Sequence, residues 1–144
     1  MQLVRMLRWM NRSRFAPSVF LLIRDADHRL KPEVERSGIS VFVSPYKKND
    51  PRQLFWLKAH FRRLGIQVAH SFLWRSDLVV SLVKWMSWSF KLVISERGER
   101  IANYTLLYRL IDRCCIFPLS DRLCANSQCG AGVAVRNGFP EEKV

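Results

Sequence analysis

The segment Phe90–Gly98 is the part of the sequence that most constrains the fold. Its first half, Phe90–Ile94, is short and rich in apolar and β-branched residues, and its second half turns polar and ends in glycine. A buried parallel strand that delivers a loop at its carboxyl end has this pattern. In open α/β sheets, ligands bind just outside the carboxyl ends of the strands. The candidate site residues here are Ser95, Glu96, Arg97 and Gly98, although charges on a plain solvated loop would look the same.

Short strand patterns alternate with helical patterns along the whole chain. The predicted strands are Ser18–Ile23, Ile39–Val43, Ile66–His70, Phe90–Ile94 and Asp121–Ala125. Helices are expected over Gln2–Met10 and Lys31–Ser37, from Asp50 to Gly65, from Ser76 or Asp77 to Met86, around Leu106 to Cys114, and from Ser127 to Val135. This alternation is typical of βαβ units. We therefore predict an α/β fold in which a Rossmann-like parallel sheet carries helices on both faces, as one domain over residues 1–144.

Helix ends and buried stripes can also be assigned from the pattern. The predicted caps are Asp50, with Pro51 at the first helical position and Gln53 completing a capping box, then Ser76 or Asp77, and Ser127. The predicted buried stripes are Leu54, Leu57, Phe61 and Leu64 in one helix, and Leu106, Leu107, Leu110, Ile111 and Cys114 in another.

The chain is strongly basic, with a formal net charge of +12. Residues 1–64 hold 14 basic and 5 acidic residues, so their net charge is +9, whereas residues 65–144 carry +3. A basic first half suggests an anionic partner such as membrane lipid, nucleic acid or a phosphorylated substrate. An arginine-rich soluble surface with no such partner would have the same composition.

The four cysteines, Cys114, Cys115, Cys124 and Cys129, form no Cys-x-x-Cys pair. We interpret them as reduced and mostly buried small hydrophobic residues of a cytosolic protein. The longest uncharged stretch, Leu123–Val135, has 13 residues and is too short to span a bilayer.

Three polar clusters follow predicted strands: His70-Ser71, Ser95 to Gly98, and Asn126-Ser127. Because parallel strands end at the same edge of a sheet, we expect these clusters to lie along one edge. Arg97 can bind phosphate through two hydrogen bonds. A lone histidine is more often structural than catalytic, and Ser127 is explained by helix capping alone.

Several of these motifs, taken in order, resemble the N-terminal half of family-4 glycosyltransferases, which are two-domain enzymes of the B-type fold. The motifs are Val68–Ser71, Val93–Gly98, Ala125–Ser127 and Gly138–Val144, and the opening Gln2–Leu7 and Phe15–Ile23 resemble the family's first helix and second strand. The resemblance covers essentially all 144 residues, as one domain of the two.

This resemblance implies transfer of a sugar from a nucleotide-sugar donor to a glycan, lipid or small-molecule acceptor. It also implies retention of anomeric configuration with no essential metal or other cofactor. The residues carried over to the cleft edge are His70, Ser71, Glu96, Arg97, Gly98 and Asn126, and Ser95 joins them as a substrate-binding candidate from its place after the strand. We expect Arg97 to stabilise the leaving diphosphate and His70 to hydrogen-bond the reacting sugar or acceptor. A cytoplasmic location is expected, with peripheral association with an anionic inner-membrane surface as one option.

The chain departs from the family pattern in three places. The family's first strand with its Gly-Gly loop and the C-terminal donor domain have no counterpart here, so we expect this chain to be poorly stable and inactive alone. In addition, many members have a second histidine two residues after the first, where this sequence has Phe72.

Two other function classes fit parts of the sequence. A basic nucleic-acid-binding α/β module could stack bases on Trp9, Trp56 and Trp74, but these residues fall at helix positions that a core would use, and no binding motif accompanies them. We therefore expect no nucleic-acid partner. A sugar-nucleotide epimerase of similar architecture is the second alternative, which the sequence leaves open.

Overall fold

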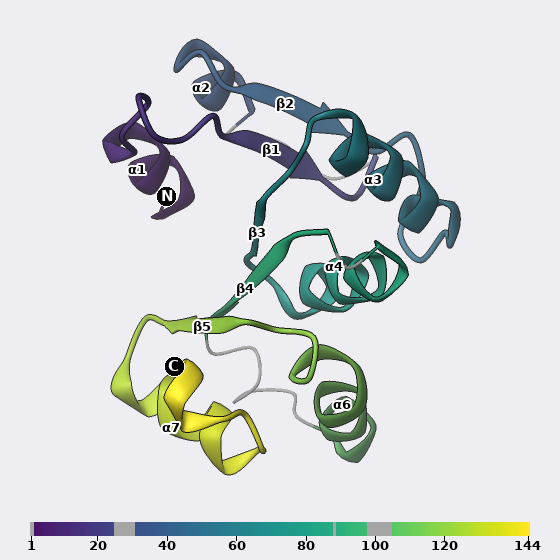
Figure 1. Ribbon diagram of the computed structural model, residues 1–144, viewed down its shortest axis with the longest axis vertical. Helices are drawn as coiled ribbons and strands as arrows, with labels where there is room; N and C mark the ends of the chain where they lie inside the picture. The colour runs from purple at the N-terminus through teal and green to yellow at the C-terminus, as the bar shows by residue number, and fades with distance from the viewer. Residues whose placement is uncertain (1, 25–30, 88, 98–104) are drawn as a thin grey trace. The chain divides into compact units, whose positions relative to one another are not determined.

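The computed structural model describes residues 2–24, 31–87, 89–97 and 105–144, and its parts form two units, Met1–Gln53 and Leu54–Val144. Helices and parallel strands alternate along the chain, which confirms the α/β class (Figure 1). The expectation of one continuous sheet is corrected, because the described strands form a two-stranded sheet and a three-stranded sheet. No helix among the described residues combines the length and apolar character needed to cross a lipid bilayer.

The first unit contains a parallel pair of strands, β1 (Ser18–Leu21) and β2 (Ser40–Val43), in register from Ser18 opposite Ser40 to Leu21 opposite Val43. Helix α2 (Lys31–Arg36) follows β1, and helix α1 (Gln2–Trp9) precedes it. The core of this unit consists of Val4, Leu7, Val19, Val34 and Ile39. Both helices and both strand regions thus contribute to one apolar cluster, as expected when each element has a single apolar face.

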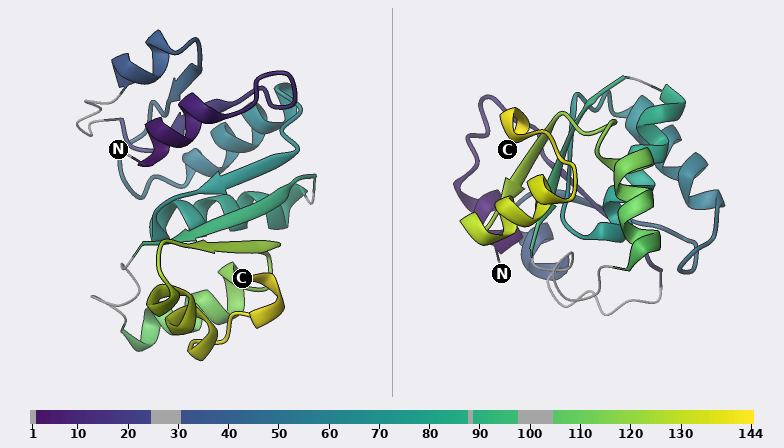
Figure 2. Two further views of the ribbon diagram at one scale, coloured as in Figure 1. Left: turned by 90° about the vertical axis from the view of Figure 1, so that its left-hand side faces the viewer. Right: turned by 90° about the horizontal axis from the view of Figure 1, so that it is seen from below.

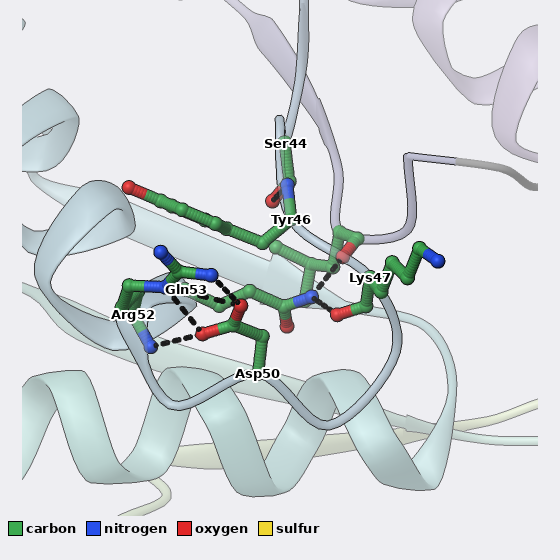
Figure 3. A network of polar contacts seen from close by, with 7 residues as sticks. Ser44, Tyr46, Lys47, Asp50, Arg52 and Gln53 are labelled. Carbon is green, nitrogen blue, oxygen red and sulfur yellow. Dashed lines mark hydrogen bonds and ion pairs between the residues drawn. The ribbon is translucent and has the colours of Figure 1, made fainter.

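Hydrogen bonds from Gln53 hold the loop between β2 and helix α3 (Arg52–Arg63), and the side chain of Gln53 is fully buried. Its amide nitrogen donates to the carbonyl oxygens of Leu22 at 2.6 Å and Lys47 at 2.8 Å (Figure 3). The predicted capping box is therefore wrong, because Gln53 reaches backward to two loops instead of to the Asp50 backbone. Asp50 does cap the helix, accepting the Arg52 backbone N–H at 2.9 Å.

The second unit is built around β3 (Val68–Ser71), β4 (Lys91–Glu96) and β5 (Arg122–Ala125), which lie in that order and all run parallel. Helix α4 (Trp74–Ser87) contacts β3 and β4, and helix α7 (Gln128–Arg136) contacts β4 and β5. Figure 2 shows α7 on one side of this sheet and α4 with α6 (Leu106–Ile111) on the other. The expected cover of helices on both faces is present in this unit.

In the second unit, the predicted cap of one helix and part of the predicted buried stripe of another are wrong. Helix α4 begins at Trp74, so neither Ser76 nor Asp77 caps it; Asp77 lies inside its first turn and is fully buried. In α3, Leu57 and Phe61 are buried as predicted, but Leu64 is 41% exposed, because the helix ends at Arg63 and Gly65 turns the chain with a positive φ of 59°.

The predicted stripe before the last strand is also wrong. Helix α6 has no buried residue, and Leu106, Leu107 and Leu110 are exposed; it continues as a π-helix (Asp112–Ile116), whose Ile116 enters the core. The cysteines are all free, as expected, but they are not mostly buried, since Cys114, Cys124 and Cys129 are exposed. Cys124 is exposed because it alternates along β5 with the buried Leu123.

The carboxylate of Asp121 joins several elements at the amino end of this sheet by hydrogen bonds. Asp121 accepts hydrogen bonds from Lys84 on α4, from the Leu92 backbone N–H at 2.8 Å, and from Lys91 at 3.1 Å. Partial burial alone would raise the pKa of this carboxyl, but the bonds from Lys84, Leu92 and Lys91 outweigh it and lower the pKa of Asp121 to about 2. The carboxylate thereby links α4, β4 and the start of β5.

We expect Gln53→Leu to lower the free energy of unfolding by about 1–3 kcal/mol, because two carbonyl oxygens lose their buried donor while the side-chain volume is kept. Urea denaturation measures this change. Gln128→Leu, at an exposed position, is the matched control and should change stability by less than about 0.5 kcal/mol. Equal effects of the two substitutions would contradict the proposed clamp.

We expect Asp121→Asn to lower the free energy of unfolding at pH 7 by about 1–3 kcal/mol, because the mostly buried Lys84 loses its counter-charge. Since folding depresses this carboxyl's pKa from 3.8 to about 2, its contribution is present above about pH 4 and is lost as the pH falls towards 2. Urea melts of both proteins from pH 7 to pH 2 should therefore converge. Lys91→Gln, on the exposed side of the same carboxylate, should cost less than about 1 kcal/mol.

Candidate functional site

The carboxyl ends of β3, β4 and β5 bring together polar side chains from separate parts of the sequence. His70 lies opposite Val93 and Ser71 opposite Ile94, so β3 ends beside the last part of β4. On the other side, Glu96 lies opposite Ala125, and Asn126 follows directly. The expectation that these clusters share one sheet edge is met for every predicted site residue that the structure describes; Gly98 lies outside the described residues.

His70 and Ser95 form the central contact of this edge, with 2.8 Å between His70 Nε2 and Ser95 Oγ. Side chains alternate along a strand, so Ser95 projects from the same face as Val93, the register partner of His70. Ser95 was predicted as a loop residue, but β4 extends through Ser95 and Glu96 because both pair with β5. The hydroxyl is consequently held on a strand, which fixes its direction.

Phe72 packs beside the contact between His70 and Ser95. Its ring stacks on the His70 ring with centroids 4.3 Å apart, and the Arg97 guanidinium carbon lies 4.6 Å from the centroid of the same Phe72 ring. Phe72 therefore contacts both predicted catalytic residues. In the sequence, Phe72 is only a departure from the family pattern and has no assigned role, because a single aromatic residue after a strand is most often part of the core.

His70 is held in its neutral form by this environment. Burial lowers its pKa below the usual 6.5, and the positive charge of Arg97 lowers it further. A neutral imidazole at pH 7 can either donate or accept a hydrogen bond, depending on its tautomer. The ring is thus suited to hydrogen-bond a substrate hydroxyl.

Ser71 points away from this group. Its hydroxyl donates to Asp77 Oδ1 at 2.5 Å, and both side chains are buried. The geometry gives Ser71 a structural contact with the first turn of α4 and does not support the predicted substrate-binding role. Asp77 was considered only as a helix cap, so its buried partner was missed.

Glu96, Asn126 and helix α7 meet on the other side of the edge. Glu96 is 1% exposed, and its carbonyl oxygen accepts the Asn126 N–H at 3.4 Å. A Cβ atom on Gly130 would lie 3.3 Å from Glu96 Cγ and 3.8 Å from Asn126 Oδ1. Gly130 therefore provides the space in which Glu96 sits. Ser127 caps α7 as predicted, accepting the Gly130 N–H at 3.1 Å.

The geometry also separates this edge from the cavity of about 410 Å³ at the opposite end of the sheet. That cavity is lined by Gln67, Lys84, Ser89, Phe90, Lys91 and Asp121. It surrounds the ion pairs of Asp121 and contains none of the predicted site residues. Within the described part of the chain, no group of three or more His, Cys, Asp or Glu side chains could hold a metal ion.

Comparisons of the chain with protein-family models, with curated proteins and with solved structures give no match in any of the three.

We expect the ring of His70 to titrate below pH 6.5 and Arg97→Gln to raise its pKa, because the substitution removes a neighbouring positive charge. NMR titration of the histidine ring protons measures both changes. Arg63→Gln, a charge change on the exposed end of α3, is the matched control and should leave the His70 titration unchanged.

The lowered pKa of His70 also makes the free energy of unfolding depend on pH. In the unfolded chain the imidazole of His70 is protonated at a higher pH than in the folded chain. The stabilisation that neutral His70 gives the folded chain is therefore complete above about pH 6.5 and decreases as the solution is acidified. Unfolding midpoints of wild type and His70→Gln should differ more at pH 7.5 than at pH 5. A His70 pKa at or above 6.5 would contradict the described burial of the ring.

Proposed function

We propose that this chain provides the acceptor-side domain of an enzyme that transfers a sugar from a nucleotide-sugar donor to an acceptor. The observation that carries the proposal is the contact of Phe72 with both His70 and Arg97, and of His70 with Ser95, at the carboxyl edge of a parallel sheet. In α/β proteins this edge is the usual ligand site. The resemblance of the same segments to family-4 glycosyltransferases names the reaction class.

The proposed chemistry assigns a different role to each side chain. As the bond between the sugar and the diphosphate breaks, negative charge develops on the departing phosphate, and Arg97 would stabilise that charge. Neutral His70 would hydrogen-bond a hydroxyl of the sugar or acceptor and fix its orientation. Ser95 would set the direction of the imidazole through its 2.8 Å contact. These groups bind and orient substrates and require no bound cofactor for those roles.

The nucleic-acid alternative gains no support from two of the three tryptophans proposed for base stacking; the third, Trp9, is 91% exposed, so the predicted core position of Trp9 is wrong. Trp74 donates its ring N–H to Asp112 at 2.9 Å and packs edge-on against Tyr108. Trp56 packs against His60 with ring centroids 4.5 Å apart. Two of the three rings are therefore engaged within the fold. The epimerase alternative shares the fold class, and no described contact favours it over glycosyl transfer.

The proposal predicts that the isotope-labelled 144-residue chain binds UDP or GDP, or their sugar conjugates, at this edge. In an NMR titration, the His70 ring and Arg97 side-chain signals should shift with a dissociation constant of about 1 mM, the weak range expected for a single contact surface. Arg97→Ala should weaken binding by at least about tenfold, because a charge-assisted hydrogen bond is lost.

Arg63→Ala is the matched control, since it removes an exposed arginine of the same unit. Equal loss of binding in the two variants would indicate general attraction between a basic protein and an anion. That result, or the absence of shifts at His70 with every nucleotide, would overturn the proposed function.

A further inference from the structure

A second surface, in the first unit, combines exposed aromatic rings with arginines. Its members are Arg5, Trp9, Arg12, Arg14 and Phe15, and we refer to them as the basic aromatic surface. Trp9 is 91% exposed and Phe15 is 52% exposed. All three arginines are exposed as well. Exposed apolar patches rimmed by polar residues commonly mark an interaction surface.

Packing on the opposite face of α1 fixes the direction of this surface. Val4 and Leu7 are buried in the core cluster with Val19, Val34 and Ile39, and Leu3, Met6 and Met10 pack against it. Arg5 and Trp9 are four residues apart, so they share the other face of the helix. The apolar face of α1 is thus occupied within the protein, and among the described side chains of this helix the exposed ones are the arginines and Trp9.

The turn after α1 adds Arg12, Arg14 and Phe15 to this surface. The side chain of Asn11 accepts both the backbone N–H of Ser13 at 2.9 Å and its hydroxyl at 2.7 Å. The carbonyl oxygen of Asn11 accepts the Phe15 N–H at 3.0 Å. These bonds define the backbone of the turn locally, and Phe15 at its end is 52% exposed.

The charge of this region is uniformly positive. Residues 2–16 contain four arginines and no acidic residue. Arg8 is neutralised by Glu33 at 2.7 Å. By contrast, Arg5, Arg12 and Arg14 form no salt bridge with any residue that the structure describes. Arg12 donates from Nη2 to the Leu7 carbonyl oxygen at 3.2 Å, and the Arg14 guanidinium carbon lies 6.0 Å from the centroid of the Phe15 ring. The segment that holds the two exposed rings therefore carries three positive charges with no described counter-charge.

We propose that the basic aromatic surface docks the first unit on an anionic lipid bilayer. Tryptophan is favoured at the level of the lipid headgroups, where its ring has both apolar and polar partners. Arginines beside it would bind lipid phosphates, and Phe15 would enter the boundary with the acyl chains. Stacking of single-stranded nucleic acid uses a series of rings along a groove, which this helix and turn do not provide.

Vesicle sedimentation with the complete 144-residue chain tests this proposal. The chain should bind vesicles of phosphatidylcholine mixed with phosphatidylglycerol, bind pure phosphatidylcholine far less, and lose binding as salt is raised. Arg12→Gln combined with Arg14→Gln should weaken binding to anionic vesicles by about 25-fold, since each charge near such a surface contributes about fivefold. The matched control is Arg62→Gln combined with Arg63→Gln, two exposed positions in α3, and should change binding by less than about twofold.

Tryptophan fluorescence gives an independent measurement. The chain contains five tryptophans, and anionic vesicles should shift the emission of the wild type to shorter wavelength. Trp9→Phe should abolish this shift while circular dichroism stays unchanged, because Trp9 is exposed and supports no core contact. Equal binding to neutral vesicles, or an equal loss in the α3 control, would overturn the proposal. So would binding of single-stranded RNA through Arg12 and Arg14 without binding of anionic vesicles.

Discussion

Burial of β4 between β3 and β5 is the constraint on which both the larger sheet and the candidate site depend. Leu92 and Ile94 are completely buried, and the strand pairs along both of its sides. Burying such a side chain contributes about 1.5–3 kcal/mol, so the apolar half of β4 provides much of the local stability. The same strand then continues into Ser95 and Glu96, which are buried polar residues. Polar groups in that position are stable only when neighbouring elements satisfy them.

The two ends of this sheet therefore serve different purposes. At the amino end, the Asp121 carboxylate joins Lys84 and the Leu92 backbone N–H, so its interactions are satisfied within the fold. At the carboxyl end, His70 contacts Ser95 and Phe72 and is only half buried. Placing this group on strands gives it a fixed geometry, which loops alone would provide less well. The polar groups of the amino end thus serve the fold, whereas the half-buried His70 at the carboxyl end is left for a ligand in the proposed function.

The sequence was sufficient to predict features that depend on local pattern. The parallel strands, the Ser127 cap and the shared edge of His70, Ser95 and Arg97 all follow from hydrophobic periodicity and from polar residues placed after apolar runs. Features that depend on distant partners were missed. The leucines of α6 have the same spacing as a buried stripe, yet they are exposed, because periodicity shows that a helix has an apolar face but not what covers it. Likewise, the two carbonyls reached by Gln53 belong to loops that only the folded chain brings together.

The aromatic ring of Phe72 shows how one residue outside the expected pattern can change a site. A histidine at this position would offer a second titratable group beside His70, whereas phenylalanine offers an apolar face. That face stacks on the imidazole, and the pKa of His70 is lowered first by burial and then by Arg97. The other contact of the ring, with the Arg97 guanidinium at 4.6 Å, is attractive only for a cation. Burial and the charge of Arg97 thus favour a neutral His70, and the Phe72 ring contacts both this imidazole and the Arg97 guanidinium. Under the proposed function, the neutral ring would hydrogen-bond a hydroxyl of the sugar or acceptor, while the guanidinium would bind the phosphate.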